Sequence, residues 1–166
     1  IRRFLFIGRY DRVKGLPELY KAVDNITASN WSLTLVGPIP REHHKNDDRL
    51  RYHGSVSSAG EMKEIIDQHD VLICPSISEG MPNVILEAMA RGLGVIATDV
   101  GATATMIDGN GWLVEQKNIS ALERAIDECL NMPDHTLQGL KQRSKEIIQQ
   151  RFTWEAIIER FVQFLN

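Results

Sequence analysis

The sequence has little cysteine, no long apolar run and no excess of positive charge. Cys74 and Cys129 lie far apart in a predicted strand and a predicted helix, which excludes a disulfide framework and a paired-cysteine metal site and fits a reducing cytoplasm. No apolar run approaches the roughly 18 residues that span a membrane.

The formal net charge of −3 and the isoelectric point near 6.0 argue against a nucleic-acid partner. The 166 residues, 43% hydrophobic and 25% charged, suffice for one well-packed domain.

Dinucleotide, P-loop and metal signatures are also missing. The loop after the first predicted strand lacks a GxGxxG pattern, and it is not a P-loop because Lys14 precedes Gly15 and no Ser or Thr follows. Of the five histidines, His43 and His44 are adjacent and cannot easily face one metal, and the others stand alone. We therefore predict neither a metal nor a cofactor, and we interpret the histidines as solvated or structural.

Short apolar runs alternate with amphipathic segments along the whole chain. A run such as Val71 to Cys74 is typical of a strand covered on both faces. This order predicts an α/β fold: a Rossmann-like, doubly wound parallel sheet of about six strands in a single domain, residues 1–166. The expected strands are Phe4–Gly8, Leu33–Val36, Leu50–His53, Val71–Cys74, Val95–Thr98 and Trp112–Val114, and the expected helices are Pro17–Ala28, Ser58–Gln68, Pro82–Arg91, Ala102–Ile107, Ile119–Leu130, Leu137–Gln150 and Trp154–Leu165.

The loop that follows the first predicted strand is basic. Its sequence from Gly8 to Gly15 places Arg9, Arg12 and Lys14 at the carboxyl end of that strand. Ligands of doubly wound sheets bind at the carboxyl ends of the strands. The loop is therefore either a solvated basic segment or one side of an anion site.

A second loop and the helix after it carry two carboxylates. Glu79 follows the strand that Pro75 ends, and Glu87 lies inside the helix that we predict to begin at Pro82, a residue suited to the first helical position. The free N–H groups of the helix start, between the two carboxylates, favour an anion. The alternative interpretation is two solvated carboxylates. The geometry suits an anion flanked on both sides by hydroxyl-bearing groups.

This segment resembles the E-x7-E signature of the retaining glycosyltransferases of family GT4, with Glu79 and Glu87 as the two glutamates. Seven residues separate them, and the basic loop matches the family pattern G-R-x4-K-G through Arg9 and Lys14. The match extends over nearly the whole chain, at Pro75-Ser76, Glu79-Gly80, Leu86 to Ala90, Gly92, Val36-Gly37, Gly54 to Val56, Ala97 to Gly101, Gly111 to Val114 and Phe152 to Trp154. The resemblance implies the C-terminal, donor-binding half of a GT-B fold.

The resemblance also implies roles for individual residues. Arg9 and Lys14 would clamp the donor diphosphate, Glu79 would orient the transferred sugar and Glu87 would hold the ribose. The backbone near Val56 would meet the base. The expected catalytic residues are Arg9, Lys14 and Glu79, and the expected donor-binding residues are Val56, Gly80, Met81, Pro82, Asn83, Val84 and Glu87.

The activity implied by the resemblance is metal-independent, retaining, hexosyltransferase-like transfer in polysaccharide biosynthesis. The expected partners are a nucleotide-diphosphate sugar, either a UDP- or a GDP-sugar, and an acceptor glycan or glycolipid bound through an N-terminal domain that this chain lacks. Because the chain opens Ile1-Arg2-Arg3 without Met and enters a strand at once, we interpret it as a piece of a longer protein that is inactive alone. The expected location is the cytoplasm, including the inner face of the membrane, with which the full-length protein could associate peripherally.

One departure from the family pattern concerns the sugar side. Where the family often has G-G-x-x-E, this chain has Gly101-Ala102-Thr103-Ala104-Thr105, so Thr105 replaces the usual acid. Two other functions stay open at this point. One is a noncatalytic nucleotide-sugar-binding module, and the other is a GT-B nucleotide-sugar epimerase, whose expected catalytic acids and cleft histidine we do not find.

The last predicted helix has more apolar surface than one face of a terminal helix normally buries. Its stripe consists of Phe152, Trp154, Ile157, Ile158, Phe161, Val162 and Leu165. In GT-B enzymes this segment crosses toward the N-terminal domain. We therefore expect part of the stripe to be bare in this chain and to promote self-association. Trp31 and Trp112, like Trp154, are interpreted as core or domain-interface residues.

Overall fold

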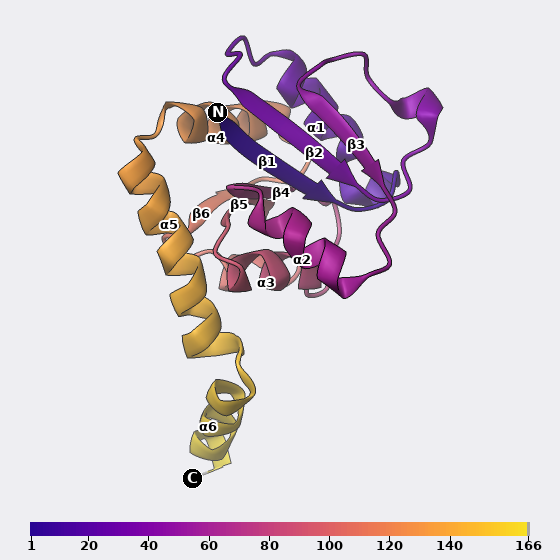
Figure 1. The fold of residues 1–166 in the computed structure, drawn as a ribbon. Helices are drawn as coiled ribbons and strands as arrows, with labels where there is room; N and C mark the ends of the chain where they lie inside the picture. Colours follow the sequence, from indigo (N-terminus) through magenta and orange to yellow (C-terminus); the bar gives the residue numbers. More distant parts are fainter. Residues whose placement is uncertain (166) are drawn as a thin grey trace.

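The computed structural model describes residues 1–165, and its centre is one parallel sheet (Figure 1). The sheet has six strands, as predicted, and their order is β3-β2-β1-β4-β5-β6. All five strand pairs are parallel, and the order reverses direction between β1 and β4. The strands are β1 Arg2–Ile7, β2 Trp31–Val36, β3 Leu50–Gly54, β4 Val71–Cys74, β5 Gly94–Thr98 and β6 Gly111–Val114.

The strands form where the apolar runs predict them. Every residue of β4 and β5 is buried, because these central strands are covered on both faces. Strands β1 and β2 each begin two residues earlier than predicted, β1 at Arg2 and not at Phe4, and β2 at Trp31 and not at Leu33. Arg2 pairs in register with Trp31 of β2, so the parallel ladder extends beyond the apolar run.

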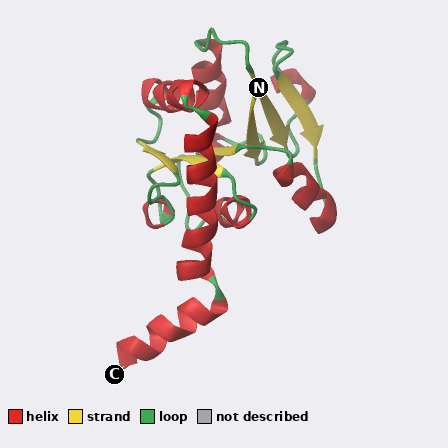
Figure 2. Cartoon of the chain, turned by 60° about the vertical axis from the view of Figure 1, so that its left-hand side comes forward, coloured by secondary structure: helices red, strands yellow, loops and turns green. Residues whose placement is uncertain are grey.

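Helices cover both faces of the sheet (Figure 2). Helices α1 (Leu16–Asp24) and α4 (Ile119–Asn131) pack into one core layer, and α2 (Ala59–Asp67), α3 (Asn83–Ala90) and α5 (Asp134–Ile147) pack into the other. Helix α1 is shorter than expected because it ends at Asp24, before the Asn-Ile-Thr stretch that favours helix poorly. A single 3-10 turn, Thr103–Thr105, replaces the short helix predicted at 102–107.

The chain ends in helix α6 (Trp154–Leu165), which follows a π-helical turn at Ile148–Phe152 and extends away from the sheet (Figure 1, Figure 2). Trp154 is 77% exposed and Phe161 is 63% exposed, so part of the apolar stripe is bare. Trp154 is therefore not a core residue, whereas Trp31 is buried and Trp112 is partly buried. No helix within residues 1–165 has the length and apolar character needed to cross a membrane.

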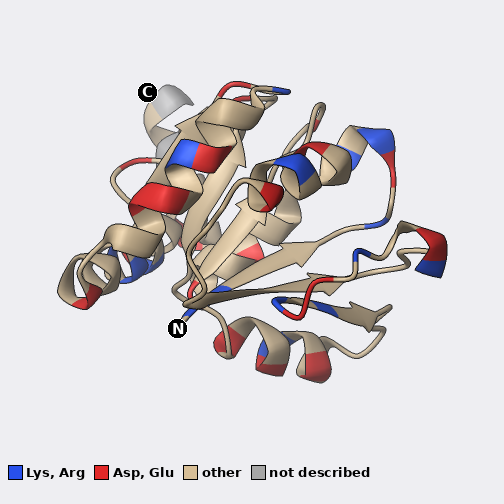
Figure 3. Ribbon diagram, turned by 90° about the horizontal axis from the view of Figure 1, so that it is seen from above, with Lys and Arg blue, Asp and Glu red and all other residues tan. Residues whose placement is uncertain are grey.

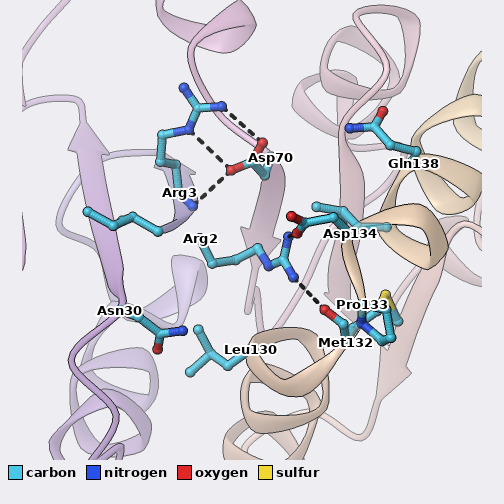
Figure 4. A pocket seen from close by; sticks show the side chains of 11 residues that line it. Arg2, Arg3, Asn30, Asp70, Leu130, Met132, Pro133, Asp134 and Gln138 are labelled. Atoms are coloured by element: carbon cyan, nitrogen blue, oxygen red, sulfur yellow. Dashed lines mark hydrogen bonds and ion pairs between the residues drawn. The ribbon is translucent and has the colours of Figure 1, made fainter.

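Charged residues of both signs are interspersed over the same outer helices and loops (Figure 3). At the amino ends of the strands, charged side chains form hydrogen bonds that join different elements of the fold (Figure 4). Asp70, which precedes β4, accepts hydrogen bonds from the Arg3 backbone N–H at 3.0 Å and from the Arg3 guanidinium at 3.1 and 3.2 Å. Lys141 of α5 contacts the same carboxylate at 3.3 Å. Asp70 thus joins β1, β4 and α5.

We predict that Asp70→Asn lowers the free energy of unfolding by about 1.5–3 kcal/mol near neutral pH, because it removes hydrogen bonds to a charged acceptor. Burial alone would raise the pKa of Asp70, but its hydrogen bonds with Arg3 hold that pKa below its usual value. A carboxyl whose pKa is lowered by folding stabilises above its unfolded pKa of about 4 and loses this effect in more acidic solution. The gap between wild type and variant should therefore narrow as pH falls below about 4.

Urea unfolding at a series of pH values measures this gap directly. A difference that stayed constant from neutral to acidic pH would contradict the assignment.

Candidate functional site

The two loops singled out in the sequence meet at the point where the strand order reverses. Strands β1 and β4 are neighbours in the sheet, yet the chain leaves them in opposite directions, β1 toward β2 and β4 toward β5. In doubly wound sheets this divergence opens a crevice at the carboxyl ends of the strands. The backbone N–H of Ile77, after β4, donates to the carbonyl oxygen of Val13, after β1, at 2.7 Å. The loops are thus joined directly.

A glycine allows this close approach. Gly15 has φ +66°, in the left-handed region, and it ends the 3-10 turn Arg12–Lys14 and precedes α1. A Cβ at this position would overlap the carbonyl oxygen of Pro75. Gly15 is therefore needed both for its backbone conformation and for the backbone contact between the two loops.

The contact places the basic loop against the first glutamate. Nζ of Lys14 lies 2.6 Å from Oε1 of Glu79, and Oγ of Ser76 donates to the same oxygen at 2.7 Å. The side chains are partly buried, with 29% of Lys14 and 14% of Glu79 exposed. An ion pair in this setting is less screened by solvent than a surface pair. The structure thus brings together two of the predicted catalytic residues.

Arg9, the third predicted catalytic residue, is more exposed. Its Nε donates to Oδ2 of Asp11 at 3.0 Å, while Oδ1 of Asp11 accepts from the N–H of Val13 and caps the 3-10 turn. The hydrogen bond from Val13 holds the pKa of Asp11 below its usual value, and Arg9 adds to this effect. Asp11 therefore shapes the loop, and its hydrogen bond keeps Arg9 beside the pocket.

A pocket of about 570 Å³ opens beside this loop. Arg9 and Lys14 form its cationic side, and Val56 and Met62 belong to its apolar side. The predicted residue Val56 therefore lines the same pocket as the two cations. The full lining comprises Ile7, Gly8, Arg9, Lys14, Val36, Gly37, Pro38, Ser55, Val56 and Met62.

Glu87 lies in a neighbouring pocket and not in this one. It is exposed on α3 and lines a largely apolar space of about 360 Å³ between α2 and α3, together with Lys63 and Arg91. Met62 borders both pockets, so they are adjacent across its side chain. Glu79 therefore lies in the loop after β4, whereas Glu87 lies inside α3 and faces the space between two helices.

Pro82 has extended backbone angles, φ −74° and ψ 101°, and caps α3; the helix itself begins at Asn83. The prediction of Pro82 as the first helical residue was wrong by one position, since its ψ is not helical. In the first turn of α3, the N–H of Ile85 donates to the Pro82 carbonyl at 3.0 Å, whereas the N–H groups of Asn83 and Val84 have no acceptor within the helix, which favours an anion nearby. Gly80, Met81 and Asn83 are exposed and Val84 is partly buried.

The loop after β5 supports Glu79 from the other side. Gly101 has φ +56°, and a Cβ there would overlap the carbonyl oxygens of Glu79 and Gly80. The N–H of Ala102 donates to the Gly80 oxygen at 2.8 Å. Thr105, which replaces the usual acid, donates to the Ala102 carbonyl at 2.7 Å and so closes its own turn.

Sequence reasoning missed several contacts around the site. The Pro75-Ser76 motif gave the signal for Ser76, but nothing in the sequence showed that its hydroxyl reaches Glu79. The Tyr10 ring stacks on His43 with centroids 3.7 Å apart, so this histidine holds the basic loop in place. No group of three His, Cys, Asp or Glu side chains within residues 1–165 is placed to hold a metal ion.

A further hollow of about 540 Å³ lies at the opposite, amino edge of the sheet (Figure 4). Its charged side chains pair with one another: Arg2 with Asp134 at 3.1 Å, and Arg3 with Asp70 at 3.1 Å. These charges are used within the fold, whereas the cations of the carboxyl edge face an open pocket.

The parallel sheet, with a cationic pocket beside the carboxyl ends of β1 and β2, defines a Rossmann-like class of α/β domain, and solved structures of the same architecture narrow it. Sucrose-phosphate synthase from Thermosynechococcus elongatus superposes with TM-score 0.82 and 29% identity over 99% of this chain and 44% of that chain. Anabaena HepE in complex with UDP has TM-score 0.80 and 20% identity, covering 98% of this chain and 48% of that chain.

A third structure, the C-terminal domain of the group 1 glycosyl transferase LpcC from Francisella tularensis, has TM-score 0.79 and 22% identity. The match covers 92% of this chain and 87% of that one. The fold is therefore that of the C-terminal domain of a GT-B glycosyltransferase.

The family described as glycosyl transferases group 1 matches residues 1–132, and the chain belongs to this family. The putative colanic acid biosynthesis glycosyltransferase WcaL of Salmonella typhimurium is 27% identical over 178 aligned positions, 96% of this chain and 44% of the relative. The putative teichuronic acid biosynthesis glycosyltransferase TuaC of Bacillus subtilis is 31% identical over 126 positions, 75% of this chain and 32% of the relative. The chain thus spans less than half the length of these relatives.

We predict that Gly15→Ala destabilises the domain by about 2 kcal/mol or more, because the left-handed conformation and the overlap with Pro75 both oppose a side chain. Gly139→Ala is the matched control: its Cβ would meet nothing within 4 Å on α5. Alanine there should stabilise by about 0.5–1 kcal/mol. Denaturant unfolding of both variants checks the pair, and equal effects would show that Gly15 has no special constraint.

Proposed function

We propose that this chain is the donor-binding domain of a glycosyltransferase and binds a nucleotide-diphosphate sugar for retaining, hexosyltransferase-like transfer. The observation that carries the proposal is the contact between Lys14 and Glu79 at the switch point of the sheet. This contact places Lys14, a cation able to bind a diphosphate, beside Glu79, a carboxylate able to accept hydrogen bonds from sugar hydroxyls. Lys14 also lines the cationic pocket, and α3 begins four residues after Glu79.

The charges at the site account for the bond-breaking step. Cleavage of a sugar–phosphate bond needs a leaving group whose growing negative charge is stabilised. Arg9, Lys14 and the first-turn N–H groups of α3, including Asn83 and Val84, supply this positive field. In this proposal they take the place of a divalent metal, and the donor phosphate accepts the proton of the acceptor.

The remaining donor groups are assigned by position. Glu79 orients the transferred sugar, and Gly80, Met81 and Pro82 border the sugar and phosphates. The backbone near Val56 meets the base, and Glu87 holds the ribose in the pocket between α2 and α3. Met62 borders both pockets, which supports a ligand that extends from one to the other. The complex of HepE with UDP, in the same fold, supports a uridine nucleotide as the first candidate and a GDP-sugar as the second.

The acceptor is assigned to another part of the protein. Because the chain matches less than half of its relatives' length, we propose that residues 1–166 form the donor half and that an N-terminal domain binds the acceptor glycan or glycolipid. The relatives named for colanic and teichuronic acid biosynthesis support a polysaccharide product made in the cytoplasm or at the inner face of the membrane. Transfer from a labelled donor by the full-length protein distinguishes this function from a noncatalytic binding module or an epimerase.

Calorimetry in EDTA should distinguish the roles of the two glutamates by comparing the affinities for UDP and UDP-glucose. If uridine nucleotides do not bind, GDP and GDP-mannose are compared instead. Glu87→Ala should weaken both members of a pair, since both contain the ribose, whereas Glu79→Ala should weaken only the nucleotide sugar. Loss of a charge-assisted hydrogen bond of about 1.5–3 kcal/mol predicts effects of about tenfold or more. Glu64→Ala, an exposed control on α2, should change neither affinity.

Equal losses of free nucleotide in both variants would reject these assignments. Binding that required Mg²⁺ or Mn²⁺ would reject the metal-independent site.

The bare face of α6 leads to a separate proposal, self-association of this chain. Exposed apolar patches of several hundred Å² tend to associate. We predict concentration-dependent association in sedimentation experiments, weakened by Phe161→Asp and retained in the matched variant Gln163→Asp, since Gln163 is exposed on the same helix but outside the apolar stripe. A monomer at all concentrations would contradict this prediction.

A further inference from the structure

Ser76 is a buried hydroxyl that the donor assignment does not use. It follows β4 and is 1% exposed, and its Oγ donates to Oε1 of Glu79 at 2.7 Å. We infer that Ser76 is a positioning residue that fixes the Glu79 carboxylate for the transferred sugar. This inference rests on the proposed function, because it assigns to Ser76 the task of orienting a group that touches the donor.

Ser76 is itself held from two directions. Oγ1 of Thr98, at the end of β5, donates to the carbonyl oxygen of Ser76, which fixes the backbone. The Sγ of Cys74 lies 3.6 Å from the Ser76 oxygen. Since the hydroxyl proton of Ser76 is directed to Glu79, Oγ of Ser76 can accept a hydrogen bond from the Cys74 thiol. Burial raises the pKa of Cys74, so the thiol keeps the proton it donates.

The contacts of Glu79 are asymmetric. Oε1 accepts hydrogen bonds from both Ser76 and Lys14, whereas Oε2 accepts none from the part of the chain that the structure describes. An ionised carboxylate has acceptor sites on both oxygens. One oxygen is thus anchored by the protein, and the other is left to accept from a sugar hydroxyl.

Ser76 is the more constant of the two anchors. Lys14 has a flexible side chain and also faces the pocket assigned to the diphosphate, so phosphate charge competes with Glu79 for its ammonium group. The Ser76 hydroxyl is fully buried and has no such competitor. Its effect on Glu79 should therefore matter most when a donor is bound.

The test is calorimetry on wild type, Ser76→Ala, Glu79→Gln and the double variant, with UDP-glucose against UDP and, if these do not bind, GDP-mannose against GDP. Ser76→Ala should weaken the nucleotide sugar about fivefold to tenfold and leave the free nucleotide within about twofold. The double variant should bind the nucleotide sugar no more weakly than Glu79→Gln alone, because both changes remove one interaction.

Ser78→Ala is the matched control. Ser78 is exposed in the same loop, and among the described residues 1–165 its hydroxyl forms no hydrogen bond with Glu79. It should change neither affinity. Thermal unfolding and binding of the free nucleotide show whether Ser76→Ala is folded, and Ser76→Thr, which retains the hydroxyl, should keep most of the sugar selectivity.

The outcomes separate this inference from the proposal beneath it. If wild type binds neither free nucleotide, the donor function fails and the role of Ser76 fails with it. If wild type binds nucleotide and nucleotide sugar but Ser76→Ala weakens both equally, or neither, the donor function stands and the inference is overturned. Additive losses in the double variant would also overturn it.

Discussion

The site depends on one backbone contact, the close packing of the loop after β1 on the loop after β4. Gly15 lies against the Pro75 carbonyl, and the Ile77 N–H donates to Val13 at 2.7 Å. Any side chain at Gly15 would push the loops apart and separate Lys14 from Glu79. Gly101 has a similar effect on the next loop, because it allows the loop after β5 to approach the carbonyl of Glu79. The chemistry of the carboxyl edge therefore begins with backbone packing.

The two edges of the sheet use charge differently. At the amino edge, Asp70 accepts hydrogen bonds from Arg3 and contacts Lys141, so its charge is compensated within the fold. At the carboxyl edge, Lys14 pairs with Glu79 but also lines an open pocket, and the exposed Arg9 lines it too. In the proposed function, an incoming phosphate would pair with Lys14 and so replace part of the pairing with Glu79 that it disrupts. At the amino edge, by contrast, the carboxylate of Asp70 is already paired with Arg3 and Lys141.

Family membership and site function rest on different observations. The match to the group 1 glycosyl transferases and the GT-B fold follow from similarity along the chain. The roles of individual residues are proposals supported by their placement, with Lys14 and Glu79 in contact and Glu87 in the adjacent pocket. The exposed apolar residues of α6 underlie the proposal of self-association, and the coverage of less than half of the relatives underlies the proposal of a separate acceptor-binding domain.

The sequence by itself determined the α/β fold and the two loops of the site. The apolar run at Val71–Cys74 is typical of a buried strand, as the structure confirms. The alternation of such runs with amphipathic helices is compatible with few sheet topologies. Tertiary structure decided what the loops do together. Lys14 and Glu79 are 65 residues apart, and their contact exists because parallel pairing makes β1 and β4 neighbours. The hydrogen bond from Ser76 to Glu79 is local, but distant segments hold the loop that contains it, through Ile77 with Val13 and Gly80 with Ala102. A motif indicates that a residue matters, whereas packing between distant segments fixes the backbone from which its side chain extends.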